Sequence, residues 1–479
     1  MKRSVQFPDL IYENIVFSNS LPSRVDYLSR PSSFDPTQLI QSPEFARLSF
    51  IRRHGLAWIV YPAASQSQLE YTIGTWGLAR LAESLIKVEI SNTRVKPLLL
   101  WMEEAKIRPE FYLTLLCKLV GCAPLAAALE VNPRLRAGLA GANIETAEKR
   151  AAALISDSGL KDVWRSIAKE RYGSAGTIGS KLKPTDPFNE QVCIPLVCYL
   201  LTGDRESLGA CFHPHKHQAG FVRDLIGGLF FLRRLDRYGR DSYISTIRQF
   251  GKNLRGFLSN LVLSPSRKGD SIEATAINSL AIDHAIGLLL KRRNRLFSRD
   301  LSTDVVALHE MVNWGFSAHS STLSDHDWPD FCKQIVFMED DQVLELLSAS
   351  QHRACHSIVQ RIRAAEPYFL VGKWFEAEHI DPVVEIINSQ YGGMVRDSAT
   401  PPELLTRYVA GDVTQEANCF AISNIRVGCQ GEPLAKQPRY RNNVAYLQNL
   451  AGHGCLYVFA REREQSRFFR KEVNALLKH

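Results

Sequence analysis

Cysteine and histidine side chains gather at one place in the sequence, where they could bind a metal ion. Cys211, His213, His215 and His217 alternate with other residues around Pro214. Thiolate and imidazole are zinc ligands, and a zinc site takes three or four of them. A proline and i, i+2 spacing are also typical of a solvated loop, and no second ligand group accompanies these residues. The loop is therefore the one visible source of ligands for relocated metal chemistry, and a plain loop is the competing interpretation.

Three further motifs lack a residue that their chemistry requires. Gly173–Lys181 carries glycines and a lysine, but its spacing differs from that of a phosphate-binding loop, so it predicts a flexible loop within Gly173–Asn189. His309 and Glu310 would begin a zinc protease motif only if position 313 were histidine, and it is Asn313. Asp325–Asp327 stands before a proline and predicts an exposed turn.

Charge and composition leave several partners open. The 479 residues carry 58 Lys and Arg against 50 Asp and Glu, a net charge of +8 that suits phosphate-bearing ligands. Basic clusters at Arg52–His54 and Lys291–Arg295 could contact nucleic acid, although such clusters on helices are more often solvated. Ten cysteines without a paired pattern or a signal peptide indicate reduced thiols and a cytoplasmic protein. No apolar run is long enough for a membrane span.

The elements that must position any site are mainly helical. Residues 10–18 predict a strand or hairpin arm, whereas residues 72–90 and 110–131 have the apolar spacing of packed helices. Beyond about Glu366 the sequence predicts three strands, at residues 383–387, 419–427 and 455–460. The charged segment 460–472 that follows them predicts a helix. We therefore expect a mainly α fold, with a helical core over residues 1–370 and a smaller α+β lobe over residues 371–479.

The segment FARLSFIRRHGLAWIVYPAASQSQLEYTIGTWGLA (45–79) resembles the HD-domain phosphohydrolases that cleave deoxynucleoside triphosphates. The family's pattern there is approximately F-RL--I-QLG----V-PGA-H-R-EHS-G---LA. The resemblance implies that the second histidine binds the metal, that the first serves catalysis, and that the arginine contacts phosphate. In this chain Tyr71 stands at the position of the metal-binding histidine, Gln66 at that of the catalytic histidine, and Gln68 at that of the arginine.

Two later blocks extend the resemblance and the losses. LCKLVGCAPLAAALE (116–130) is similar to the family's L-HDIGHGPFSHALE, but Lys118 and Leu119 replace the His-Asp pair, and Cys122 and Ala127 replace further histidines. FVRDLIGGLFFLRRLDRYGRD (221–241) is similar to IV-DLI-GPFDADRLDYLLRD, with Phe231 and Arg233 in place of the two aspartates of DAD, the second of which is a metal ligand. Other residues of these blocks match the pattern: Pro124, Ala128, Leu129, Glu130, Arg234, Leu235, Asp236, Arg240 and Asp241. A weaker match continues through Glu339–Asp341.

A divalent ion needs several oxygen or imidazole ligands, and these substitutions remove them and reverse the local charge. Lys118 and Arg233 could instead hold an anion, or they could pair internally with Glu70, Asp236 or Asp241. The residues predicted to line the altered pocket are Gln66, Gln68, Tyr71, Lys118, Arg233, Arg234 and Arg237.

The sequence thus predicts a non-catalytic HD-like protein that acts as a nucleotide-sensing or scaffolding subunit, without a metal or cofactor. Family members usually assemble, so the resemblance implies a homo-oligomer or a partner protein. Two alternatives stay open: a phosphohydrolase that uses a relocated site, and a nucleic-acid-binding module.

Overall fold

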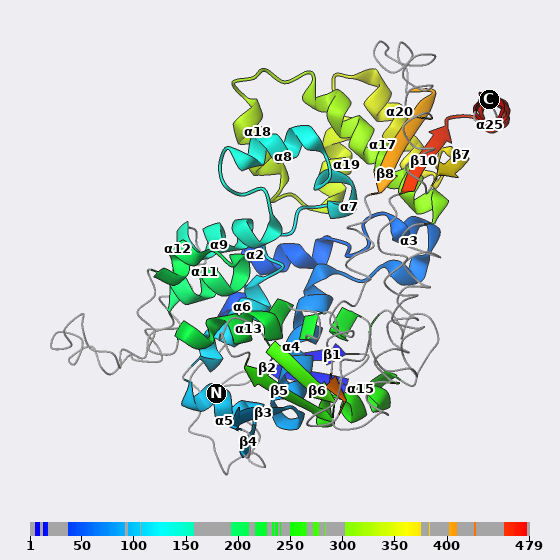
Figure 1. The fold of residues 1–479 in the computed structure, drawn as a ribbon. Helices are drawn as coiled ribbons and strands as arrows, with labels where there is room; N and C mark the ends of the chain where they lie inside the picture. Colours follow the sequence, from blue (N-terminus) through cyan, green and yellow to red (C-terminus); the bar gives the residue numbers. More distant parts are fainter. Residues whose placement is uncertain are drawn as a thin grey trace.

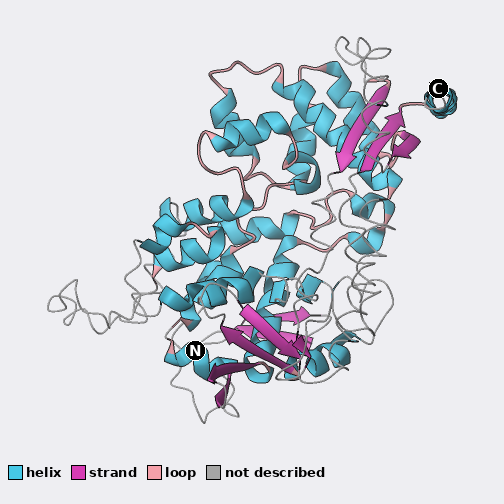
Figure 2. Ribbon diagram, in the orientation of Figure 1, coloured by secondary structure: helices cyan, strands magenta, loops and turns pink. Residues whose placement is uncertain are grey.

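The computed structural model has a mainly helical fold, as the sequence predicts, and its described strands form three small sheets (Figures 1 and 2). The structure describes residues 5–9, 13–17, 37–91, 94–105, 107–157, 193–209, 216–227, 232–233, 235–237, 240, 250–265, 272–276, 283, 302–374, 383, 402–409, 426–427 and 455–476. The predicted N-terminal arm is confirmed as an antiparallel hairpin of β1 (Val5–Asp9) and β2 (Glu13–Phe17).

The described residues form two large hydrophobic clusters, one in the lower and one in the upper part of Figure 1. The lower part holds α1 (Thr37–Ile40), α2 (Pro43–Ala46), η2 (Arg47–Phe50), α4 (Gln68–Leu85), α5 (Leu98–Glu104), α6 (Arg108–Cys117), α9 (Ala147–Asp157), α11 (Ile194–Thr202), α12 (Arg205–Gly209), η5 (Lys216–Gln218), α13 (Ala219–Gly227) and α15 (Phe250–Ser259). Its sheet has the order β4-β3-β5-β6-β9, with β3 (Lys87–Ser91), β4 (Arg94–Pro97), β5 (Leu261–Pro265), β6 (Ile272–Ala276) and β9 (Arg426–Val427).

The upper part holds α7 (Ala126–Leu129), α8 (Pro133–Ala140), α17 (Thr303–Ser320), α18 (Trp328–Ile335), α19 (Asp340–Ser348) and α20 (Arg353–Arg363). α3 (Ala57–Val60) and η3 (Pro62–Ala64) precede α4 and share a small cluster with Val305 of α17. The sheet of the upper part has the order β7-β10-β8, with β7 (Phe369–Trp374), β8 (Leu404–Val409) and β10 (Cys455–Ala460). Helix α25 (Arg463–Leu476) packs against β7. The strand predicted over residues 455–460 and the charged helix after it are thus confirmed.

The helix predicted over residues 72–90 is wrong at its C-terminal end. Ser67 and Glu70 form a capping box that begins α4, but the helix ends at Leu85. Lys87–Ser91 is instead strand β3, which pairs antiparallel with β4 and parallel with β5. Val88 is buried between exposed Lys87 and half-exposed Glu89, so the local pattern has the period of a strand.

Residues 110–131, which have the apolar spacing of packed helices, form two helices in the structure, because α6 ends at Cys117 and α7 begins only at Ala126. Leu119, Val120 and Cys122 belong to the lower cluster, whereas Ala123 and Leu125 belong to the upper cluster. The segment between α6 and α7 therefore lies at the junction of the two clusters.

The C-terminal sheet packs on both of its faces. Tyr457 and Phe459 of β10 belong to the upper cluster, and the alternating residues Leu456 and Val458 pack with Phe469 of α25. All six residues of β10 are buried, as expected for a central strand covered on both faces. The sheet thus shares its core with helices that precede residue 370; the predicted division of domains at 370 stays a prediction.

α25 also contacts the free edge of β7. The register between β7 and β10 skips Val371, which marks a β-bulge. Ser466 Oγ donates to Leu370 O at 2.7 Å, and Arg470 donates to Val371 O at 2.7 Å and to Leu370 O at 2.8 Å. Side chains of α25 therefore satisfy the outward carbonyls of this edge strand.

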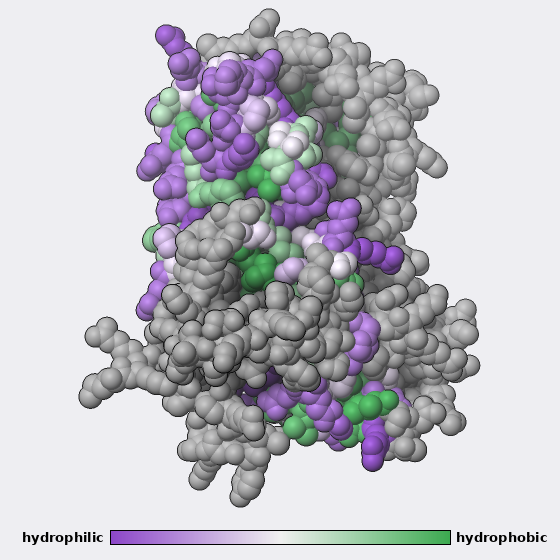
Figure 3. All heavy atoms as spheres, turned by 90° about the vertical axis from the view of Figure 1, so that its left-hand side faces the viewer, coloured by the Kyte–Doolittle hydropathy of each residue, from purple (hydrophilic) through white to green (hydrophobic). Residues whose placement is uncertain are grey.

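Several predicted features lie wholly or largely outside the described residues: the loop 173–189, the basic cluster 291–295, and most of the strands predicted at 383–387 and 419–427. Within the described part of the chain, no helix is long and apolar enough to cross a bilayer. On the face that Figure 3 shows, hydrophilic residues cover most of the coloured upper half, with hydrophobic residues in smaller islands between them.

Candidate functional site

The first group of predicted site residues lies where α4 begins. Arg53 N donates to Gln66 O at 2.9 Å, and Gln68 N donates to Ile51 O at 2.9 Å. These bonds fix the start of α4 against residues 51–53. Gln68 is buried, and the enclosed Gln66 Oε1 accepts no hydrogen bond from the residues that the structure describes.

Tyr71 joins the first block to the third. Its hydroxyl donates to Arg233 O at 2.5 Å, and its ring is only 4% exposed. The guanidinium carbon of Arg53 lies 3.9 Å from the centre of the same ring, a close cation–π contact. Two positions that the resemblance assigns to metal ligands, Tyr71 and Arg233, therefore lie side by side although they are far apart in the sequence.

The side chain of Arg233 pairs with a carboxylate that the sequence analysis did not consider. Arg233 Nη1 lies 3.6 Å from Glu148 Oε1 of α9, and both side chains are about 30% exposed. Two of the partners expected from the sequence have other roles, since Glu70 closes the capping box of α4 and Asp236 pairs with Arg240 at 2.9 Å. Asp241 and the predicted site residue Arg234 lie outside the described residues, and Arg237 is partly buried.

The positions of the family's His-Asp pair stand where α6 ends. Lys118 is the C-cap residue of α6 and is partly exposed, whereas Leu119 is buried in the lower cluster. These two positions thus supply one cation and one apolar side chain. A lysine ammonium has only hydrogen-bond donors and leucine has no ligand atom, so they do not fit a divalent metal ion.

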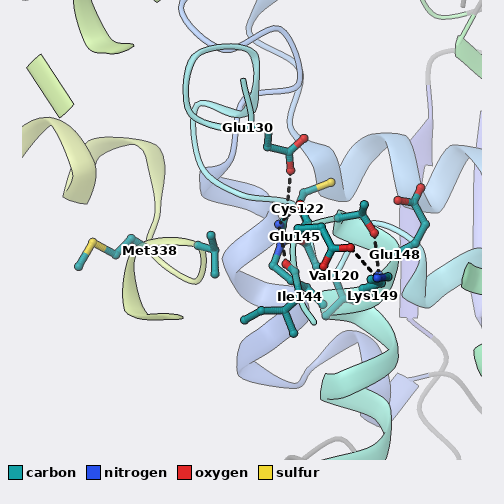
Figure 4. A network of polar contacts seen from close by, with 12 residues as sticks. Val120, Cys122, Glu130, Ile144, Glu145, Glu148, Lys149 and Met338 are labelled. Carbon is teal, nitrogen blue, oxygen red and sulfur yellow. Dashed lines mark hydrogen bonds and ion pairs between the residues drawn. The ribbon is translucent and has the colours of Figure 1, made fainter. Parts of the chain in front are cut away.

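Two buried arginines, Arg47 and Arg150, bind the backbone that follows Lys118. Figure 4 labels several of the residues that accept their hydrogen bonds, among them Val120, Cys122 and Glu130. Arg47 Nη2 donates to Val120 O at 2.8 Å and to Cys122 O at 2.9 Å, and its Nη1 reaches Val336 O and Met338 O in the upper part. From the other side, Arg150 Nε donates to Gly121 O at 2.6 Å. We call residues 120–122 the arginine-bound loop. Arg47 thus links this loop, which belongs to the lower cluster, to the backbone of Val336 and Met338 in the upper part.

Arg150 is completely buried, and its charge is matched by Glu130, the C-cap residue of α7. Its Nη1 also donates to Ile144 O and Glu145 O. Burial lowers the pKa of Arg47 to about 10, so this side chain stays charged at neutral pH. Burial raises the pKa of Cys122 to about 12, so this cysteine is a neutral thiol rather than a nucleophile.

Asp340, at the start of α19, binds the first two blocks together. Its Oδ2 accepts from Arg52 N at 2.6 Å, and its Oδ1 accepts from Leu125 N at 2.7 Å. Leu125 has φ 44°, a left-handed conformation that is uncommon for leucine and that this hydrogen bond helps to hold. Burial raises the pKa of Asp340 to about 6.

The zinc protease motif excluded by the sequence is a structural network in α17. His309 Nε2 accepts from Leu56 N at 3.0 Å. Glu310 is buried and accepts from Arg407 of β8 at 3.2 Å and from Asn313 at 3.0 Å. Burial raises the pKa of Glu310 to about 7, although the neighbouring Arg407 opposes the shift.

Two other sequence predictions can be compared with the structure. Ser324–Asp327 forms an exposed turn closed by their side chains, as predicted. Of the cysteine–histidine loop, only the last residue, His217, has a described side-chain environment, and it is exposed. Within the part of the chain that the structure describes, no three His, Cys, Asp or Glu side chains gather closely enough to hold a metal ion.

Sequence reasoning missed the roles of Arg47, Arg53 and Arg150. The cluster Arg52–His54 looked like a basic surface, but Arg53 packs on Tyr71 and His54 is buried. Arg150 precedes three alanines and a leucine, and a lone arginine at the start of such an apolar run is the signal that could have identified it.

No family model matches this chain. A segment of 62 residues is 37% identical to an uncharacterized protein, MJ1154, of Methanocaldococcus jannaschii, and it spans 13% of this chain and 14% of that protein. A hypothetical protein from Aquifex aeolicus, with a crystal structure at 2.0 Å, superposes with a TM-score of 0.61 over 99% of this chain and 100% of its own, at 15% identity. The two chains share a fold. Neither relative has a described activity.

Proposed function

We propose that this chain is a non-catalytic protein with an HD-like helical core that binds a nucleotide or another phosphate-bearing ligand at the Tyr71–Arg233 site. In this role it acts as a sensing or scaffolding subunit, alone in a homo-oligomer or with a partner protein. The observation that carries the proposal is the direct hydrogen bond between Tyr71 and Arg233, because it joins two positions that the resemblance assigns to one metal ion.

Residues that match the family's pattern have structural roles here, which supports a preserved fold. Arg47 and Glu130 belong to the network around the arginine-bound loop, Asp236 pairs with Arg240, and Asp340 accepts two backbone N–H groups. The positions expected to bind metal carry Tyr71, Lys118, Leu119 and Arg233 instead. The chain thus keeps residues that hold the helices together at these positions, and it lacks the side chains that would bind a metal ion.

The charge of the site favours an anion over a cation. Arg53 packs on the ring of Tyr71, the hydroxyl of Tyr71 donates to the main-chain carbonyl of Arg233, and both arginine residues are only partly buried. A planar guanidinium fork suits phosphate oxygens. The ion pair of Arg233 with Glu148 is long and partly solvated, so it contributes little and a phosphate group can compete with Glu148 for the same cation.

Thermal unfolding of the purified protein with deoxynucleoside triphosphates, ribonucleotides and inorganic phosphate tests this proposal. A ligand that binds only the native state must raise the unfolding temperature. We expect a nucleotide to do so without Mn²⁺, and we expect Lys118→Ala with Arg233→Ala to remove the effect. Arg255→Ala, an exposed arginine on α15, is the matched control. A stoichiometric transition metal in the purified protein, or a shift that needs Mn²⁺, would contradict the proposal.

A further inference from the structure

The outer face of α25 carries cations with no evident structural role. Arg463, Arg467 and Lys471 are all exposed, and none of them forms an ion pair with another described residue. They are four residues apart, so they lie on one side of the helix at intervals of about 6 Å. Arg470, in contrast, is occupied by the carbonyls of β7. The stripe of three cations is therefore additional to what the packing of α25 needs.

An aromatic side chain lies next to this stripe. Phe468 is 57% exposed, the highest exposure of any large hydrophobic side chain in the described part of the chain. Its ring packs edge-on against the buried Phe469, at 5.7 Å between the ring centroids, and more than half of Phe468 stays open to solvent. Covering this ring by a binding partner would remove apolar surface from water and would therefore be favourable.

We infer that the outer face of α25 is a binding surface for single-stranded nucleic acid. Evenly spaced cations can follow a phosphate backbone, and an exposed ring can stack on an unpaired base, which a duplex does not offer. Figure 1 shows α25 at the edge of the molecule beyond β7, well away from α4 and α6. The surface is therefore separate from the Tyr71–Arg233 site, and the two proposals can fail independently.

Fluorescence anisotropy of the full chain with labelled dT20 and rU20, over a series of salt concentrations, tests the inference. Losing three phosphate contacts should lower the slope of log K against log salt by about 2. The variant Arg463→Gln/Arg467→Gln/Lys471→Gln should show this change and bind at least 10-fold more weakly. Arg94→Gln/Arg136→Gln/Arg255→Gln removes the same charge from exposed positions elsewhere and should leave both the slope and the affinity nearly unchanged.

Phe468→Ala separates stacking from charge. It should weaken binding by about 5- to 100-fold with an unchanged salt slope. The two oligonucleotides distinguish DNA from RNA as the source of the strand, and a duplex of equal length should bind more weakly than either. The inference is overturned if the wild type binds neither strand, or if the control triple variant loses as much affinity. It is also overturned if phosphatidylserine vesicles are bound through the same cations while the strands are not.

Discussion

The guanidinium of Arg240 lies directly over Gly74 of α4, in the space that any other side chain would fill. A Cβ atom built at position 74 would be 1.5 Å from Arg240 Nη2. Arg240 is fixed there by its ion pair with Asp236, which is completely buried. The absence of a side chain at Gly74 thus lets α4 approach the third block, and so brings Tyr71 to Arg233.

Gly74→Ala should lower the free energy of unfolding by about 2–3 kcal/mol, because the added methyl displaces Arg240 and disturbs its buried pair with Asp236. Chemical denaturation at neutral pH measures this. Gly256→Ala is the control, since Gly256 is also helical and nothing lies within 4 Å of its Cβ position. That variant should be neutral or slightly stabilising. Equal losses in the two variants would contradict the proposed packing.

Arg150→Lys should destabilise the protein by about 2–4 kcal/mol although the charge is kept. One ammonium cannot replace a fork that reaches Gly121 O, Ile144 O and Glu130 together, and buried acceptors are left without donors. Arg136→Lys on the exposed face of α8 is the matched control and should change stability by less than about 0.5 kcal/mol. Unfolding curves for both variants decide the point. A neutral Arg150→Lys would mean that the arginine-bound loop does not depend on this fork.

The stability of the protein should fall between about pH 5 and pH 8 through Glu310. Its folded pKa of about 7 lies above the ordinary value of about 4.5 for a glutamate, so the folded state keeps this proton to higher pH than the unfolded chain does. The contribution of Glu310 is therefore complete below about pH 4.5 and is lost as the pH rises through about 7, by up to about 3 kcal/mol.

Glu310→Gln removes this titration. As the pH rises, the wild type should therefore lose free energy of unfolding relative to the variant. Denaturation at several pH values measures the difference. Glu366→Gln, at an exposed position, should show no such trend. Parallel pH profiles for wild type and Glu310→Gln would show that Glu310 titrates normally.

Restoring the family's ligands should restore metal binding, if the resemblance places them correctly. We expect the combined variant Tyr71→His, Lys118→His, Leu119→Asp and Arg233→Asp to bind one Mn²⁺ or Zn²⁺ ion per chain and to unfold at a higher temperature with the metal. Calorimetric titration gives the stoichiometry. The variant that keeps Arg233 but carries the other three changes should bind far more weakly, because that cation repels the ion. Absence of binding in the complete, folded variant would contradict the alignment of the three blocks.

Much of the fold was predictable, since helix α25, strand β10 and the N-terminal hairpin follow local patterns that tertiary contacts reinforce. The prediction failed where a local pattern was overridden or too short. Ile86–Ile90 alternates like a strand but directly continues the apolar spacing of α4. Its pairing with the neighbouring β4 and with β5, more than 170 residues away, makes it a strand. The sequence around Lys118 is apolar enough for a helix, yet hydrogen bonds from Arg47 and Arg150 hold it as a loop.

For the Tyr71–Arg233 site, the sequence predicted which residues belong to it but not the contacts that they make. Gln66 and Tyr71 could be named from the first block and Arg233 from the third, and the hydrogen bond between Tyr71 and Arg233 joins these two blocks. Glu148 could not be named, because it lies on α9, outside every block that resembles the family. Ion pairs between exposed carboxylates and distant arginines have no sequence signature, and only the packing of α9 reveals this one.

The contact between α25 and β7 has a consequence for how the chain avoids self-association. A strand at the rim of a sheet can template the growth of ordered aggregates, because its unpaired backbone groups accept another strand. Here Ser466 and Arg470 already occupy the carbonyls of Leu370 and Val371 at the bulge. Partial unfolding that releases α25 would expose the edge of β7 together with Phe469 and Val473. The partly unfolded chain would then be prone to aggregate.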